Sequence, residues 1–129
     1  MLHLNSIHHI AIISSDYEQS KKFYTEVLGF TIIKETYRAE RASYKLDLAL
    51  NGKYCIELFS FPDPPKRVSR PEACGLRHLA FGVDDLTATL NELEKLNIKH
   101  EGVRLDDLTN KRFTFIEDPD GLPIEFYER

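Results

Sequence analysis

The chain has 129 residues, 42% of them hydrophobic and 29% charged, which suits one ordinary domain with a buried core. Seventeen basic and twenty-one acidic side chains give a net charge of −4 without a basic run, so no nucleic-acid partner is expected. No stretch resembles a signal peptide or a membrane span. Cys55 and Cys74 are too far apart for a CxxC site, so we expect free thiols in a cytoplasmic protein.

The first half of the chain predicts the element order β-α-β-β-β. Asp16, followed three residues later by Gln19, predicts the start of a helix, and Gly29 predicts its end. Asn51-Gly52 is a strong signal for a hairpin between two strands. The strands of this half are expected over residues 7–13, 30–37, 43–50 and 54–61.

A proline-rich stretch then interrupts the pattern, because proline cannot continue a strand ladder. After it the same element order returns, with a helix from Leu86 to Leu96 that Asn97 can end in the left-handed conformation. The strands of this half are expected over residues 76–83, 98–105, 111–117 and 123–128. We therefore predict one domain over 1–129, built from a module at about 5–61, a linker at about 62–75 and a module at about 76–129.

The two halves match one another in sequence. The tetrapeptide that begins at His9 (His-Ile-Ala-Ile) matches the one at His78 (His-Leu-Ala-Phe), and the segment around Glu57 matches the segment around Glu125. Each half thus carries a histidine early in its first strand and a glutamate in its last strand. This pattern indicates an internal duplication that includes polar residues.

Strand alternation directs these four side chains to the face of each sheet that the helix does not cover. A desolvated carboxylate in such a strand costs several kcal/mol unless a cation or water pairs with it. Two imidazoles and two carboxylates without a thiolate suit a divalent ion with open water positions, as in catalytic sites. The alternative is a solvated sheet face on which His9, Glu57, His78 and Glu125 are ordinary surface groups.

The motifs resemble those of the vicinal oxygen chelate superfamily, which includes glyoxalase I, fosfomycin-resistance thiol transferases, extradiol dioxygenases and bleomycin-resistance proteins. The matching stretches span nearly the whole chain. They are His8 to Ile12, Ser20 to Phe30, Ile56 to Leu58, Gly75 to Phe81 and Asp118 to Glu125. The resemblance implies an α+β fold of two tandem βαβββ modules, whose curled mixed sheets form a cleft.

In glyoxalase I the metal ligands are His, Glu, His and Glu in chain order, so the resemblance implies His9, Glu57, His78 and Glu125 here. His9 is favoured over His8 by alignment and because neighbouring strand residues point to opposite faces. The implied cofactor is one divalent ion per site, which could be Ni, Zn, Co, Mn or Fe.

The activity implied is that of a lactoylglutathione lyase-like enzyme, which acts on a hemithioacetal or a related vicinal-oxygen substrate. The reaction is a proton transfer through a metal-bound enediolate. Glu125 is the base by resemblance, and Glu57 is the other candidate. The alternatives are a thiol transferase or dioxygenase of the same superfamily, or a non-catalytic protein that binds a small molecule.

Nothing in the sequence identifies the thiol or the substrate. Cationic side chains could bind an anionic substrate beside aromatic walls, and the candidates are Arg38, Arg41, Arg70, Arg77, Lys111 and Arg112, with Tyr44 and Phe59 as walls. The resemblance also implies a homodimer. Each site would then lie within one chain or draw one His–Glu pair from each subunit.

Overall fold

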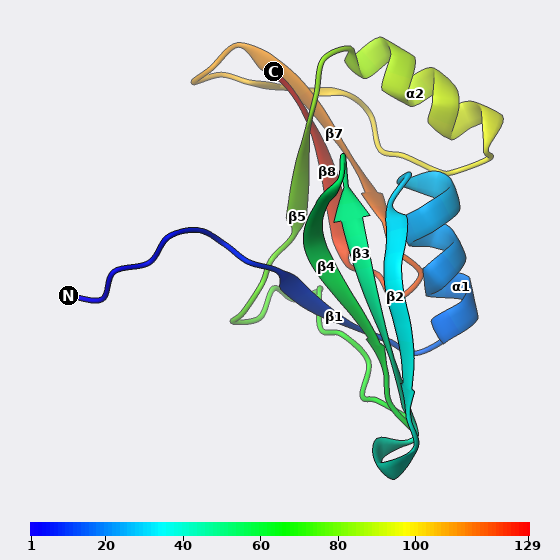
Figure 1. Ribbon diagram of the computed structural model, residues 1–129. Coiled ribbons are helices and arrows are strands. Elements are labelled where there is room, and N and C mark those ends of the chain that lie inside the picture. The colour runs from blue at the N-terminus through cyan, green and yellow to red at the C-terminus, as the bar shows by residue number, and fades with distance from the viewer. The chain divides into compact units, whose positions relative to one another are not determined.

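The computed structural model describes residues 1–129, which form two compact units, residues 1–66 and 67–129. The division lies within the predicted linker. Each unit contains one four-stranded mixed sheet and the helix that follows its first strand, so the element order β-α-β-β-β occurs twice (Figure 1). None of the helices has the length and apolar character needed to cross a lipid bilayer.

The first unit has a sheet with the strand order β1-β4-β3-β2. Strand β1 runs parallel to β4, whereas β2, β3 and β4 are antiparallel neighbours. Its elements are β1 (Ile10–Ser14), α1 (Tyr17–Lys22), β2 (Thr31–Arg38), β3 (Ser43–Leu50) and β4 (Lys53–Ser60). The predicted first strand is therefore wrong at its start, because residues 7–9 precede the ladder.

Helix α1 begins as the sequence predicts. The Asp16 side chain accepts a hydrogen bond from the Gln19 backbone N–H at 3.1 Å, which satisfies a donor of the first turn. The helix continues as a π-helical turn over Phe23–Val27, and Gly29 follows with a positive φ of 79°. The inward face of the sheet, with Leu46, Leu48 and Leu58 fully buried, forms the core under this helix.

Strand β4 contains a bulge that determines which side chains share a face. The Asn51-Gly52 turn pairs Ala49 with Tyr54, but Leu48 pairs with Ile56 and leaves Cys55 as an extra residue. A bulge of this kind shifts the alternation of the strand by one residue. Tyr54 and a residue three positions later can therefore project from the same face of the sheet.

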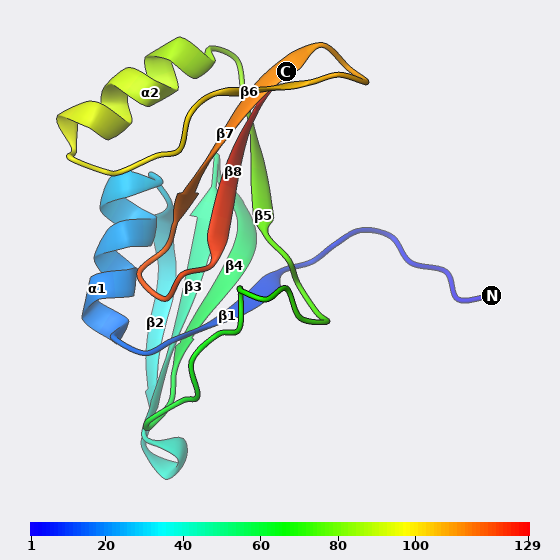
Figure 2. The same cartoon turned by 180° about the vertical axis from the view of Figure 1, so that it is seen from behind.

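The second unit repeats this topology with the strand order β5-β8-β7-β6, and β5 runs parallel to β8 (Figure 2). Helix α2 packs against β8, and the Asp85 side chain accepts a hydrogen bond from the Ala88 backbone N–H at its start. The elements are β5 (Leu79–Val83), α2 (Leu86–Lys95), β6 (Arg104–Asp106), β7 (Lys111–Glu117) and β8 (Pro123–Glu128).

The strand predicted over residues 98–105 is mostly wrong. Only residues 104–106 pair with β7, as the three-residue strand β6. Upstream of it, the Glu101 backbone N–H donates to the Phe115 carbonyl, and the Thr114 hydroxyl donates to the Glu101 carbonyl. The Thr114 hydroxyl donates to this segment where a ladder would have a backbone N–H of β7, so the segment runs beside β7 without forming a strand.

A polar cluster ties α1 to β2. The Tyr17 hydroxyl and the Lys21 ammonium donate to the same Glu35 carboxylate oxygen, at 2.5 and 2.7 Å. The hydrogen bonds from Lys21 and Tyr17 hold the pKa of the Glu35 carboxyl below its ordinary value of 4.5. A lowered folded-state pKa stabilises the fold above pH 4.5, and this stabilisation is lost as the pH falls through the lowered value.

We expect Glu35→Gln to reduce the free energy of unfolding at pH 7 by less than about 1 kcal/mol, because the pair with Lys21 is partly exposed. The difference between variant and wild type should disappear near pH 3. Urea denaturation at both pH values measures this difference. Glu26→Gln, at an exposed position in the π-helical turn that follows α1, is the control. A difference that grows as the pH falls would contradict this assignment.

Candidate metal centre

Glu57 lies in the middle of β4 on the face of the sheet away from α1. Its Cα partner on the edge strand β1 is Ala11, and its partner on β3 is Asp47. The small side chain of Ala11 leaves room beside the carboxylate. His9 lies two residues before Ala11, and its Nε2 atom is 3.7 Å from Oε2 of Glu57.

Two further side chains engage the Glu57 carboxylate. The Tyr54 hydroxyl donates to its Oε2 atom at 2.5 Å, and the Lys45 ammonium lies 3.5 Å from the same oxygen. Desolvation raises the pKa of Glu57, but the hydrogen bond from Tyr54 and the charges of Lys45 and His9 outweigh it and lower that pKa. Desolvation and the Glu57 hydrogen bond raise the pKa of Tyr54, so the phenol remains a donor. Glu57 is therefore held as an anion.

His8 lies closer to this cluster than the sequence predicts. Because β1 begins only at Ile10, alternation does not separate the two histidines, and their Nδ1 atoms are 2.8 Å apart. The His8 ring also contacts the Tyr54 ring, with centroids 5.3 Å apart. His8 thus packs against the outer nitrogen of His9, while Nε2 of His9 faces Glu57.

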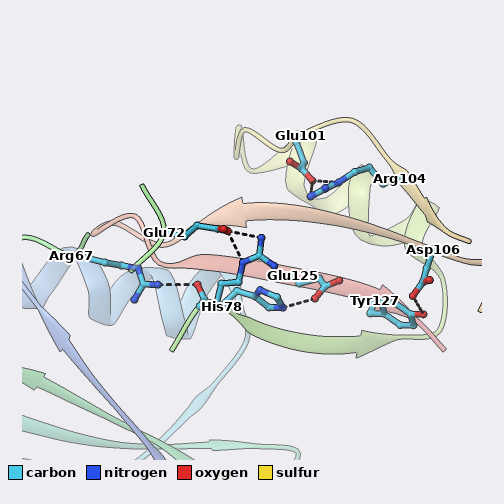
Figure 3. A network of polar contacts seen from close by, with 9 residues as sticks. Arg67, Glu72, His78, Glu101, Arg104, Asp106, Glu125 and Tyr127 are labelled. Carbon is cyan, nitrogen blue, oxygen red and sulfur yellow. Dashed lines mark hydrogen bonds and ion pairs between the residues drawn. The ribbon is translucent and has the colours of Figure 1, made fainter. Parts of the chain in front are cut away.

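The second unit repeats the His–Glu pair. Glu125 on β8 is the Cα partner of Ala80 on the edge strand β5, as Glu57 is of Ala11. The Nε2 atom of His78 lies 3.0 Å from Oε2 of Glu125 (Figure 3). The edge of the His78 ring meets the Phe115 face, with centroids 5.1 Å apart. Tyr127 lies close enough to Glu125 for their charges to interact, but no lysine or tyrosine of this unit donates a hydrogen bond to the Glu125 carboxylate.

The segment that leads to His78 is held by Arg67, a residue that belongs to none of the strands. One Arg67 guanidinium nitrogen donates to the carbonyls of Leu76 and Arg77, at 2.7 and 2.9 Å. These two residues directly precede His78 in the chain. Arg67 therefore fixes the backbone from which the imidazole projects.

The spacing of each pair fits two donors of one metal ion. Donors about 2.1 Å from an ion lie about 3.0–3.6 Å apart when they subtend about 90–120°. The observed separation is 3.0 Å in the second unit, within this range, and 3.7 Å in the first, just beyond it. No group of three or more His, Cys, Asp or Glu side chains with metal-binding geometry occurs, so each unit offers two of the four expected donors.

The structure divides the substrate-binding candidates between the faces of the two sheets. Phe59 and Arg38 lie on the Glu57 face, and alternation places Lys111 on the face of β7 that bears Phe115. Tyr44, the other expected wall, stacks on Tyr17 of α1 with centroids 4.5 Å apart, on the face of the sheet opposite Glu57.

Arg112 also lies on the helix side of its sheet. Its guanidinium donates two hydrogen bonds to the Glu128 carboxylate and one, at 3.5 Å, to Thr87 of α2. This ion pair leaves Arg112 on the face opposite Phe115. The sequence pattern Lys111-Arg112 could not separate the two side chains without the strand register.

Tyr54, Lys45 and Asp47 are members of the Glu57 cluster that sequence reasoning missed. Lys45 and Asp47 lie two residues apart on β3 and project from the face of the sheet that carries Glu57. Alternation along this strand could have indicated their position. Tyr54 joins them only because of the bulge at Cys55, which leaves no signature in the sequence.

Comparison with known proteins gives a consistent family. Residues 6–126 match the model of the Glyoxalase/Bleomycin resistance protein/Dioxygenase superfamily. The chain is 63% identical over 129 residues to the uncharacterized protein YaeR of Escherichia coli (strain K12), covering 100% of both chains. It is 30% identical over 127 residues to the lactoylglutathione lyase of Haemophilus influenzae, covering 93% of this chain and 90% of that protein.

Solved structures agree with this family. The glyoxalase family protein from Enterococcus faecalis is 46% identical, with a TM-score of 0.89 over 95% of this chain and 97% of that one. A fosfomycin resistance protein, FosX from Listeria monocytogenes, was solved as a mutant in complex with Mn(II). It shares the fold at a TM-score of 0.74 and 15% identity, over 97% of this chain and 93% of that one.

We expect Tyr54→Phe to lower the free energy of unfolding by about 1.5–3 kcal/mol, because the variant loses a hydrogen bond to a charged, mostly buried carboxylate. Urea denaturation at pH 7 measures the loss. Tyr44→Phe is the matched control, since its ring contributes stacking on the opposite face. Equal effects of the two substitutions would contradict a role of the Tyr54 hydroxyl in holding Glu57.

Proposed function

Since the chain belongs to the Glyoxalase/Bleomycin resistance protein/Dioxygenase superfamily, we propose that it is a divalent-metal-dependent lyase or isomerase of the glyoxalase I type. Its ligands are His9, Glu57, His78 and Glu125. The observation that carries the proposal is the repeated approach of a histidine Nε2 atom to a glutamate Oε2 atom, once in each unit. The lactoylglutathione lyase relative supports the same reaction class.

The donor set suits a catalytic ion. Two neutral imidazoles and two carboxylates give a net charge that balances a divalent cation, and they leave positions for substrate oxygens. When bound, the ion supplies Lewis-acid polarisation of two adjacent substrate oxygens. Ni, Zn, Co, Mn and Fe all accept such ligands, so the proposal extends to the class of ion and not to one element.

The two glutamates have different surroundings, and we assign them different roles. Tyr54 and Lys45 hold Glu57 as an anion, which suits a permanent ligand. Within its unit Glu125 lies near His78, Phe115 and Tyr127, and no phenol or ammonium is bonded to its carboxylate as Tyr54 and Lys45 are to that of Glu57. Glu125 is therefore the proposed base.

The proposed reaction is an isomerisation. Glu125 removes the proton from the hemithioacetal carbon and delivers it to the adjacent carbon, which had been the carbonyl carbon. The electron pair of the broken C–H bond passes between the two carbons and forms the new C–H bond at the second carbon. The hydroxyl proton of the first carbon moves to the former carbonyl oxygen, and the pair of that O–H bond forms the new carbonyl bond. The product is a 2-hydroxyacyl thioester, with no net oxidation and no co-reactant.

Both His–Glu pairs include an edge strand, β1 in one unit and β5 in the other. Backbone groups on the outer side of an edge strand are open to another chain. We propose a homodimer, in which the two pairs of a site come from one chain or from two.

The ligand assignment predicts that metal-free protein takes up one divalent ion per chain in equilibrium dialysis against Zn, Ni, Co or Mn. We expect His9→Ala and His78→Ala each to weaken this binding at least about tenfold, because each removes one imidazole donor. His100→Ala is the control, since that ring contacts a backbone carbonyl and an exposed glutamate. Unchanged affinity in both His9→Ala and His78→Ala would rule out the assignment.

The reaction is tested with metal-loaded protein, methylglyoxal and a panel of thiols that includes glutathione. We expect thioester formation with at least one thiol, and a fall in kcat of about 10²–10⁴ in Glu125→Gln, which removes the base. Circular dichroism checks that the variant is folded. If wild type turns over no faster than Glu125→Gln with any thiol, the protein is not a glyoxalase I-type enzyme.

A further inference from the structure

The Glu57 face of the first sheet carries a guanidinium supported on two aromatic rings. The Arg38 guanidinium carbon lies 4.8 Å from the centroid of the Phe59 ring and 5.7 Å from that of Phe61. The two rings stack with their centroids 5.8 Å apart and their planes 16° from parallel. We call this group the Arg38 shelf. It combines a cation–π contact with a flat support that restrains the plane of the guanidinium.

The charge of Arg38 is not neutralised within its unit. Its one hydrogen bond runs from Nη2 to the Ser43 hydroxyl at 2.8 Å, and no carboxylate of residues 1–66 forms an ion pair with it. The Nε atom is buried without an acceptor. A partly buried guanidinium without an acidic partner is costly, so it commonly marks a place for an anion.

Arg104 in the second unit provides a comparison. It packs over two rings in the same manner, 5.0 Å from the Phe113 centroid and 5.2 Å from that of Phe115. Its guanidinium, however, pairs with Glu101 at 2.6 Å. The two arginines make similar aromatic contacts, and only the Arg38 shelf lacks a carboxylate within its unit.

The shelf is adjacent to the His9–Glu57 pair. Phe59 follows Glu57 by two residues on the same face of β4, which separates their Cα atoms by about 7 Å. Lys45, the Cα partner of Phe59, lies between them, with its ammonium 3.5 Å from the Glu57 carboxylate. Along this face the charge thus changes from the acidic metal-ligating end to a cationic aromatic end.

We propose that the Arg38 shelf binds an oxyanion, a carboxylate or a phosphate, carried by the substrate whose vicinal oxygens face Glu57. That the Arg38 shelf binds an oxyanion depends only on the contacts of Arg38, whereas the role of the shelf as a substrate subsite rests on the proposed function. A guanidinium fork matches both anions through two parallel N–H···O bonds. The substrate class is therefore a small vicinal-oxygen compound with an anionic group at its far end.

The shelf is tested in metal-free protein, titrated separately with inorganic phosphate and with malonate. Chemical shifts of the arginine Nε–Hε groups report binding at individual guanidinium groups. We expect Arg38→Met to weaken binding at least about tenfold, because it removes the charge-assisted fork. Arg38→Lys keeps the charge but loses the planar fork, so its affinity for the anion should lie between those of wild type and Arg38→Met. Lys34→Met, which removes an exposed cation of the same strand β2, should bind like wild type.

The two anions distinguish the kinds of anionic group that the substrate could carry. Tighter binding of malonate indicates a carboxylate, and tighter binding of phosphate indicates a phosphate ester. Equal affinity in wild type and Arg38→Met, or an equal loss in Lys34→Met, would overturn the shelf. Metal uptake is measured on the same variants and should be unchanged in Arg38→Met. Loss of anion binding in Arg38→Met from a protein that takes up no metal would support the shelf while defeating the proposed function.

Discussion

A carboxylate in the middle of a sheet needs a cation or a strong donor, because its desolvation costs several kcal/mol when it is unpaired. Both units meet this requirement in the same way. A glutamate lies beside an alanine of the parallel edge strand, and the histidine two residues before that alanine turns its Nε2 atom toward the carboxylate. The repeat preserves the register of β1 with β4 and of β5 with β8, and with it the position of a His–Glu pair. The fold and the proposed chemistry both depend on this register.

The two copies of the pair have diverged in what surrounds the carboxylate. Glu57 accepts a hydrogen bond from a phenol and faces an ammonium, whereas Glu125 has an aromatic ring beside its histidine. A duplicated site of identical halves could not assign separate roles to its two carboxylates. The differing neighbours provide a physical basis for one fixed anion and one proton acceptor.

Much of this arrangement could be predicted from the sequence, because it depends on local signals. The Asp16 cap, the Asn51-Gly52 turn and the left-handed Asn97 all occur where the residue types favour them. The two His–Glu pairs follow from the duplication itself. What alternation could not give is the exact register, since the bulge at Cys55 moves Tyr54 onto the Glu57 face. Alternation along β3 places Tyr44 on the same face as the buried Leu46 and Leu48, and this face packs under α1, where Tyr44 stacks on Tyr17.

The central claim is that two His–Glu pairs share one divalent ion. X-ray absorption spectroscopy of protein loaded with one equivalent of Zn(II) tests it most directly, because imidazole rings give a multiple-scattering signal that counts histidine ligands. The account predicts two imidazoles and oxygen donors around each zinc, with about 2.0–2.1 Å to nitrogen. A spectrum with a single imidazole per zinc would show that the pairs act separately, and a spectrum with none would remove the metal centre altogether.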